Sequence, residues 1–188
     1  MTILVVGGGG REHAIIKKIR ENKAVETVYA LPGNGGMAKD AVCVPIGACD
    51  IPAIVAFALE NRIDYAVVAP DDPLVLGCVD RLEEAGIPCF GPRANAAVLE
   101  GSKVFSKDLM KKYGIPTADY RVFTDLESAL AYLESAPIPI VVKADGLALG
   151  KGVTVAVTRE QARDAVLAAM QDKKFGKSGD RLVIEEYL

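Results

Sequence analysis

Histidine is almost missing from this sequence, and its cysteines are not arranged as ligands. His13 is the single histidine, and the four cysteines include no Cys-x-x-Cys pair. Zinc sites and disulfide frameworks need such residues at characteristic spacings, so the sequence predicts neither. Positive charge is not in excess either, because the 188 residues carry a net charge of −3 and the isoelectric point is near 5.3. Nucleic-acid-binding domains usually carry a basic stripe, and we therefore expect no nucleic-acid partner.

Long apolar runs are also missing. The longest, near Ile51–Leu59, is too short to span a bilayer. Met1–Val6 lead directly into Gly7-Gly8-Gly9-Gly10, a beginning that is unlike a signal peptide. We therefore expect a cytoplasmic protein that does not bind membranes. Hydrophobic residues make up 51% of the chain, enough for a substantial core.

The first half of the chain alternates short apolar runs with amphipathic segments. The expected strands are Ile3–Val6, Val25–Leu31, Tyr65–Ala69 and Pro88–Phe90. The expected helices are Arg11–Arg20, Ile51–Asn61 and Lys103–Tyr113, together with a helix that Asp72 caps and Gly86 ends. This βαβ alternation predicts an α/β fold with a Rossmann-like parallel sheet covered by helices on both faces.

The pattern changes after Pro116, where we place a domain boundary. Residues 1–116 form the predicted Rossmann-like domain with a linker helix, and residues 117–188 form a small α+β lobe. The lobe is expected to contain a helix at Leu126–Ser135, two strands around a glycine-rich loop, a helix that begins after Thr158, and a last strand at Leu182–Tyr187.

The glycine-rich loop is the most informative motif. An apolar strand from Ile138 ends in Lys143, and Gly146, Gly150, Lys151 and Gly152 follow before a second β-branched run. Glycines let backbone N–H groups approach a polyanion, and two ammonium groups can neutralise its charge, so a nucleoside triphosphate fits. The spacing is one residue short of a Walker A loop and leads into a strand. An ordinary glycine-rich hairpin with a solvated lysine remains an alternative, although protein kinases cover phosphates with a similar hairpin above a strand lysine.

A second glycine cluster, Gly7–Gly10, lies between the first strand and the first helix. A dinucleotide-binding reading fails because Glu12 or His13 occupies the position of the third glycine, and no acidic residue ends the second strand. An anion site at a helix N-terminus remains, with Arg11 as an added donor. The loops that contain Asn34 and Asp71 follow the next two strands, at the sheet edge where open α/β folds bind ligands.

Several segments, taken together, resemble one family. Val5–Ala14, Pro32-Gly33-Asn34, Glu100–Lys103, Lys143–Ala148, Gly150–Val153 and Ile184–Leu188 are similar to the phosphoribosylamine–glycine ligases (glycinamide ribonucleotide synthetases), which are ATP-grasp enzymes of purine biosynthesis. The resemblance covers the whole chain in order. It departs from the family pattern at Gly8, Asp71 and Leu149, where Asn, Glu and Ala are usual.

The resemblance implies ligation of glycine to 5-phosphoribosylamine with ATP, through glycyl phosphate. It implies ATP contacts from Lys103, Lys143, Gly146, Gly150, Lys151, Gly152, Glu185, Glu186, Tyr187 and Leu188. It implies that the phosphorylated amine contacts Gly8, Gly9, Gly10, Arg11, Glu12, His13, Asn34, Asp71 and Pro73.

Family members are more than twice this length, so the resemblance implies a fragment. The missing part would supply the carboxylates for Mg²⁺ or Mn²⁺ and the catalytic residues, and we expect no metal site here and no activity from this chain alone. We expect a monomer whose partners are small molecules. Two alternatives are a non-catalytic module that binds a phosphorylated metabolite and another ATP-grasp carboxylate–amine ligase.

Overall fold

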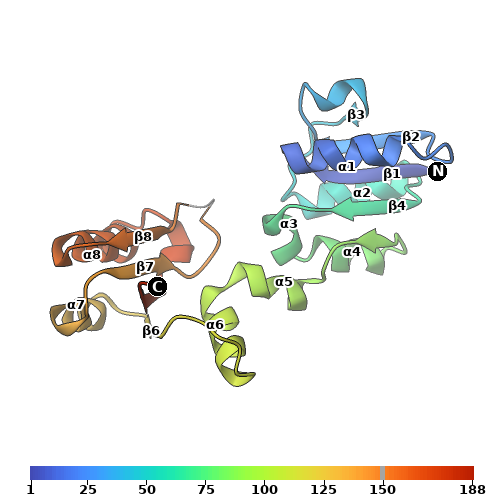
Figure 1. Cartoon of the computed structure of the whole chain (residues 1–188). Coiled ribbons are helices and arrows are strands. Elements are labelled where there is room, and N and C mark those ends of the chain that lie inside the picture. The colour runs from blue at the N-terminus through green and yellow to red at the C-terminus, as the bar shows by residue number, and fades with distance from the viewer. Residues whose placement is uncertain (149–150) are drawn as a thin grey trace. The chain divides into compact units, whose positions relative to one another are not determined.

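The computed structural model describes residues 1–148 and 151–188 and separates into two compact units, Met1–Ala97 and Val98–Leu188 (Figure 1). The division falls earlier than the boundary near residue 116 that the sequence suggested. Helix α6 (Lys103–Lys112) belongs to the second unit, because Ser102 and Val104 at its start bond to Asp145. Leu149 and Gly150, which the sequence analysis named, lie outside the described residues.

The first unit contains the parallel sheet that the sequence predicted. Its strand order is β3-β2-β1-β4-β5, and every neighbouring pair is parallel. The strands are β1 (Thr2–Gly7), β2 (Thr27–Pro32), β3 (Val42–Cys43), β4 (Tyr65–Val68) and β5 (Cys89–Phe90). The two-residue edge strand β3 was not predicted, since it is too short to show an apolar pattern.

Helices cover both faces of this sheet (Figure 1). Side chains of β1 alternate, so that Ile3 and Val5 pack with α1 while Leu4 and Val6 pack with α2 and α4. The helices of this unit are α1 (Gly10–Arg20), α2 (Ile51–Glu60), α3 (Asp71–Val75) and α4 (Cys78–Glu84), with a 3-10 turn at Met37–Lys39; α5 (Ala94–Gly101) leads into the second unit.

One predicted helix is broken in the structure. The sequence suggested a single helix from Asp72 to Gly86, but α3 and α4 are separated at Gly77, which has φ of +81°. Such a left-handed residue ends a helix, and glycine adopts it without steric cost. Helix α3 also begins two residues earlier than expected, at Asp71 after Pro70, so Asp72 lies within the helix and does not cap it.

The second unit is the expected small α+β lobe. Its antiparallel sheet has the order β6-β9-β7-β8, and β7 and β8 form the predicted hairpin around the glycine-rich loop. The strands are β6 (Tyr120–Phe123), β7 (Ile140–Ala144), β8 (Val153–Ala156) and β9 (Leu182–Glu186). The helices are α6, α7 (Leu126–Ser135) and α8 (Arg159–Val166). Helix α8 continues into a π-helical turn at Leu167–Gln171, and a 3-10 turn follows at Gly176–Gly179. Strand β6 was not predicted.

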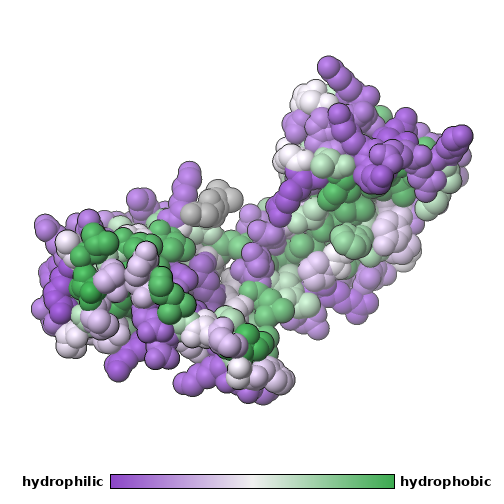
Figure 2. Space-filling model, viewed as in Figure 1, coloured by the Kyte–Doolittle hydropathy of each residue, from purple (hydrophilic) through white to green (hydrophobic). Residues whose placement is uncertain are grey.

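The two faces of this second sheet differ in character. Ile140, Val142 and Ala144 of β7 pack into the core beneath α7 and α8. The alternate residues, including Lys143, point to the opposite face, where Val153 and Val155 of β8 are about half exposed at 45% and 48%. Green surface remains visible on the second unit among hydrophilic side chains in Figure 2. The opposite face thus combines a cation with apolar surface.

Candidate functional site

Lys143 lies near the end of β7 and forms an ion pair with Glu185 of β9. Strand pairing explains the contact, because Val141 is opposite Glu185 and Lys143 is two residues further along the same face. The carboxylate of Glu185 is buried, whereas the Lys143 side chain remains 25% exposed. Lys143 is therefore paired with a buried carboxylate and is not the solvated lysine of an ordinary hairpin.

Sequence analysis missed a second cation at Glu185. Lys107 of α6 places its Nζ 2.6 Å from Oε2 of Glu185. The same ammonium group donates to Thr117 Oγ1 at 2.7 Å and to the Ala118 carbonyl at 3.2 Å. Burial raises the pKa of Glu185, but the ammonium groups of Lys107 and Lys143 outweigh it, so that the pKa lies below the ordinary value. The carboxylate is therefore held in its charged form.

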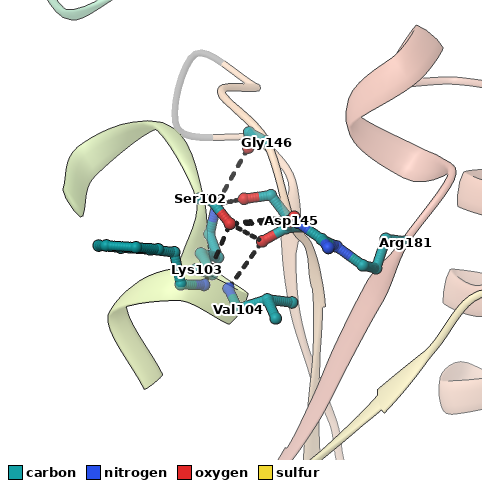
Figure 3. A network of polar contacts seen from close by, with 7 residues as sticks. Ser102, Lys103, Val104, Asp145, Gly146 and Arg181 are labelled. Atoms are coloured by element: carbon teal, nitrogen blue, oxygen red, sulfur yellow. Dashed lines mark hydrogen bonds and ion pairs between the residues drawn. The ribbon is translucent and has the colours of Figure 1, made fainter. Parts of the chain in front are cut away.

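Asp145 anchors the start of the glycine-rich loop (Figure 3). Its side chain is buried, and Oδ1 accepts hydrogen bonds from the Val104 backbone N–H at 2.7 Å and from Ser102 Oγ at 3.0 Å. Oδ2 accepts from Arg181 Nε at 2.7 Å and also contacts Nη2 of the same guanidinium. One carboxylate thus joins the loop to α6 and to the residue that precedes β9. Arg181 was not predicted, since it lies in no motif.

Lys103 extends from the start of α6 toward the same loop (Figure 3). Its Nζ donates to the carbonyl oxygens of Gly146, at 3.1 Å, and Asp145, at 3.4 Å. Burial lowers the pKa of Lys103; the charge of Asp145 opposes this effect, and the nearby charge of Lys143 adds to it. The two lysines that the resemblance implied are therefore close enough to repel one another.

The glycines of the loop allow close packing. A Cβ atom at Gly146 would lie 2.5 Å from Ser178 Oγ, and one at Gly152 would lie 2.7 Å from the Ala148 Cβ. Lys151 is exposed between them, and Gly150 lies outside the described residues. At the end of β9, Glu186 accepts a hydrogen bond from the Asp119 N–H at 2.9 Å, and Tyr187 and Leu188 are exposed.

In the first unit, the cluster Gly7–Gly10 forms the turn from β1 to α1. Gly7 has φ of +125°, and a Cβ there would lie 2.7 Å from Glu12 Cγ. Glu12 is buried and accepts a hydrogen bond from the Gly9 N–H at 2.6 Å. Its side chain caps the helix from inside the turn, whereas Gly8, Gly9 and Gly10 are exposed.

The neighbouring loops meet this turn, as expected for the carboxyl edge of a parallel sheet. Asn34 Nδ2 donates to the Gly8 carbonyl at 2.9 Å, and Asn34 Oδ1 accepts from the N–H groups of Gly36 and Met37. The His13 and Asp40 side chains are hydrogen-bonded at 3.0 Å, a contact that lowers the pKa of Asp40.

Arg11 and Asp71 complete this edge of the first sheet. The Arg11 guanidinium, 67% exposed, lies 4.0 Å from the Asp71 carboxylate. Pro73 is buried in α3. The Gly9 N–H is occupied by Glu12, so the donors on this edge that suit a phosphate group are the backbone of Gly8 and Gly10 and the guanidinium of Arg11.

Comparisons with known proteins agree with this two-unit structure. Residues 1–100 match the model of the phosphoribosylglycinamide synthetase N domain, and residues 101–188 match that of the ATP-grasp (A) domain of the same synthetase. The chain belongs to the phosphoribosylglycinamide synthetase family. The resemblance inferred from the motifs is thereby confirmed, and the ATP-grasp assignment of the second unit with it.

Relatives of known name match over the full chain. A phosphoribosylamine–glycine ligase from Streptococcus suis is 54% identical over 189 residues, which are 100% of this chain and 45% of that protein. The ligase from Escherichia coli K12 is 51% identical over 190 residues, 100% of this chain and 44% of its own length. The crystal structure of the Thermotoga maritima ligase superposes with a TM-score of 0.79 at 30% identity and covers 100% of this chain and 44% of that one. The chain thus spans less than half the length of these relatives.

Two further observations bear on membranes and metals. Among the described residues, no helix is both long and apolar enough to cross a membrane. The same residues contain no group of three or more His, Cys, Asp or Glu side chains placed to hold a metal ion.

Proposed function

We propose that this chain forms the N-terminal part of a ligase that joins glycine to 5-phosphoribosylamine at the expense of ATP. The products would be glycinamide ribonucleotide, ADP and phosphate. The observation that carries the proposal is the convergence of Lys103 and Lys143 at the glycine-rich loop. Full-length relatives named for this reaction support it.

The second unit would bind the triphosphate of ATP. In the first step, a carboxylate oxygen of glycine attacks the γ-phosphorus, which gives glycyl phosphate and releases ADP. This step depends on charge neutralisation and alignment, which Lys103, Lys143 and the N–H groups of the loop can supply. Backbone groups of Glu185–Leu188 would pair with the adenine, and the loop Gly146–Gly152 would cover the phosphates.

The first unit would bind the phosphorylated amine. The exposed glycines Gly8–Gly10 and the Arg11 guanidinium would hold its 5-phosphate, while His13, Asn34 and Asp71 line the same edge. In the second step, the amine nitrogen attacks the acyl carbon of glycyl phosphate, the C–O bond to phosphate breaks, and the nitrogen loses a proton. Glu12 would act indirectly, by holding the turn.

We place Mg²⁺ or Mn²⁺ binding and the catalytic residues in the part of the relatives that this chain does not cover. The proposal therefore includes no turnover by the 188-residue chain alone. It also includes a monomeric, cytoplasmic enzyme whose partners are small molecules. Size-exclusion chromatography of the active protein would test the oligomeric state.

A chimaera tests the proposal directly. This chain would replace the matching N-terminal part of the E. coli K12 ligase, and ADP and glycinamide ribonucleotide would be measured with ATP, glycine and 5-phosphoribosylamine. We expect turnover that requires all three substrates and is strongly reduced in Lys143→Ala. A chimaera that hydrolyses ATP with a different amine would indicate another carboxylate–amine ligase. A folded chimaera that binds ribose phosphate without ATP turnover would indicate a non-catalytic module.

A further inference from the structure

Glu185 forms ion pairs with Lys143 and Lys107. The motifs and the proposed function give roles to Glu185 and Lys143, but none to Lys107. Its side chain is buried, with 8% of the residue exposed. A lysine is rarely buried unless its charge is paired, because desolvating an ammonium group is costly. Here its ammonium group donates hydrogen bonds to Thr117 and Ala118 and forms an ion pair with Glu185. The ring of Tyr120 lies 5.5 Å from Nζ on a further side.

These contacts fix the direction in which Lys107 points. Thr117 and Ala118 belong to the segment between α6 and β6, and Glu185 belongs to β9. An ammonium group held by two oxygens of one segment is fixed in position beside Glu185, with Nζ 2.6 Å from Oε2. The carboxylate, which is 6% exposed, has little freedom to rotate away.

Glu185 in turn contacts Lys143 through its other oxygen, Oε1. Two positive charges therefore share one buried negative charge. If Lys107 neutralises Glu185, the positive charge of Lys143 remains available to an anion. If Lys107 were absent, Glu185 and Lys143 would neutralise one another, and the carboxylate would draw Lys143 away from the exposed side of the sheet.

We propose that Lys107 is a positioning residue, which acts through Glu185 to keep the ammonium group of Lys143 oriented and available for the phosphates of a nucleoside triphosphate. The inference rests on the proposed function for the identity of the ligand. Lys107 itself touches no substrate in this scheme. Its effect should appear in the binding of ATP and be absent from the binding of glycine.

The test uses Lys107→Met in the chimaera, with Lys111→Met as the matched control on the exposed side of the same helix. Losing one charge-assisted contact to phosphate should raise KM for ATP about tenfold or more. KM for glycine should stay within about twofold of the unsubstituted chimaera, since only the phosphate contact is weakened. Lys107→Arg should retain much of the wild-type KM for ATP, because the charge is kept.

A second substitution separates positioning from folding. In Lys107→Met/Glu185→Gln the buried negative charge is also removed, so Lys143 is released and KM for ATP should return toward the wild-type value. A purely structural role predicts the opposite, since two losses of buried contacts would add. An unchanged KM for ATP in folded Lys107→Met, or a double variant worse than the single one, would overturn the proposal.

A direct measurement makes the result independent of the overall reaction. In the 188-residue chain with ¹³C-labelled lysine, the Lys143 side-chain signal, assigned by its loss in Lys143→Arg, would be followed as sodium tripolyphosphate is added. We expect a shift in the wild type and a clearly smaller one in Lys107→Met. Equal shifts in both would refute the positioning role. An inactive chimaera with the expected shifts would refute the proposed reaction instead.

Discussion

Replacing Asp145 with asparagine should destabilise the second unit while leaving the first unit unchanged. The carboxylate receives the N–H of Val104 at 2.7 Å, the hydroxyl of Ser102 at 3.0 Å and the guanidinium of Arg181. Asparagine has a single acceptor oxygen, which can serve Val104. Its NH₂ group would then face Arg181, so that donor meets donor.

The magnitude follows from the bond that is lost. A charge-assisted hydrogen bond contributes about 1.5–3 kcal/mol. The Arg181 side chain is 44% exposed and can turn to water, which reduces the loss, so we expect a decrease of about 2 kcal/mol in the free energy of unfolding. Asp145→Ala should cost more, about 3 kcal/mol, because the buried N–H of Val104 would also lose its acceptor.

Urea unfolding followed by ¹⁵N-resolved NMR would measure this, because signals of the two units can be read separately. Asp180→Asn is the matched control: Asp180 pairs with Lys173 at 2.8 Å, and the two side chains are 58% and 56% exposed. Such a surface pair contributes about 0–1 kcal/mol. If Asp145→Asn lowered stability no more than Asp180→Asn does, or lowered both units equally, the buried network would not be what holds the loop to α6.

Three further predictions concern other parts of the chain. Gly7→Ala should lower the free energy of unfolding by about 2 kcal/mol or more, because φ is +125° and the new Cβ meets Glu12. Gly10→Ala has open space around the new Cβ and should raise the free energy of unfolding by about 0.5–1 kcal/mol. Thermal unfolding would compare the two variants. The pKa of Glu185 is lowered from 4.5, so its ionised form stabilises the fold fully above about pH 4.5. The stability difference between wild type and Glu185→Gln should therefore shrink as pH falls below that value, and a constant difference would contradict the assignment. Lys143→Ala should lower kcat/KM for ATP in the chimaera by about 10- to 100-fold, and unfolding assays should also show a modest loss of stability, because its partner Glu185 is buried.

Much of the fold was readable from local patterns. Alternating strand and helix periods predicted the parallel sheet, and a lysine at the end of an apolar run before a glycine-rich loop predicted the hairpin β7–β8. These features depend on residues close in sequence. The short strands β3 and β6 carry too few residues for a period to appear, so they were missed.

The sequence pattern did not predict the break between α3 and α4, for a different reason. Val75, Cys78, Val79 and Leu82 have helical spacing, and all of them pack into the same core cluster. Because both short helices face one core, the apolar stripe continues across Gly77 although the backbone does not. A period therefore indicates which side is buried, while the left-handed glycine decides where the helix ends.

The resemblance named Glu185 and Lys143, but the sequence did not indicate that they contact one another or that Lys107 joins them. Lys107 and Lys111 lie on one helix and look alike in sequence, yet the first is buried against β9 and the second is exposed. The contact joins residues far apart in the chain, and nothing near Lys107 indicates it. Long-range ion pairs of this kind depend on how helix and sheet pack, which periodicity does not determine.

The distribution of charge in the second unit separates structural cations from those available to a ligand. Arg181 pairs with Asp145, and Lys107 and Lys143 share Glu185, so two buried carboxylates of this unit face three cations. Lys103 and Lys143 stand beside them, and the lowered pKa of Lys103 reflects its burial together with the charge of Lys143. Positive charges near the loop therefore outnumber the buried carboxylates, which is costly in an empty protein, and a polyanion would relieve that repulsion on binding. The same arrangement that weakens the free unit thus favours a triphosphate over a neutral ligand, which is the selectivity that an ATP-dependent ligase requires.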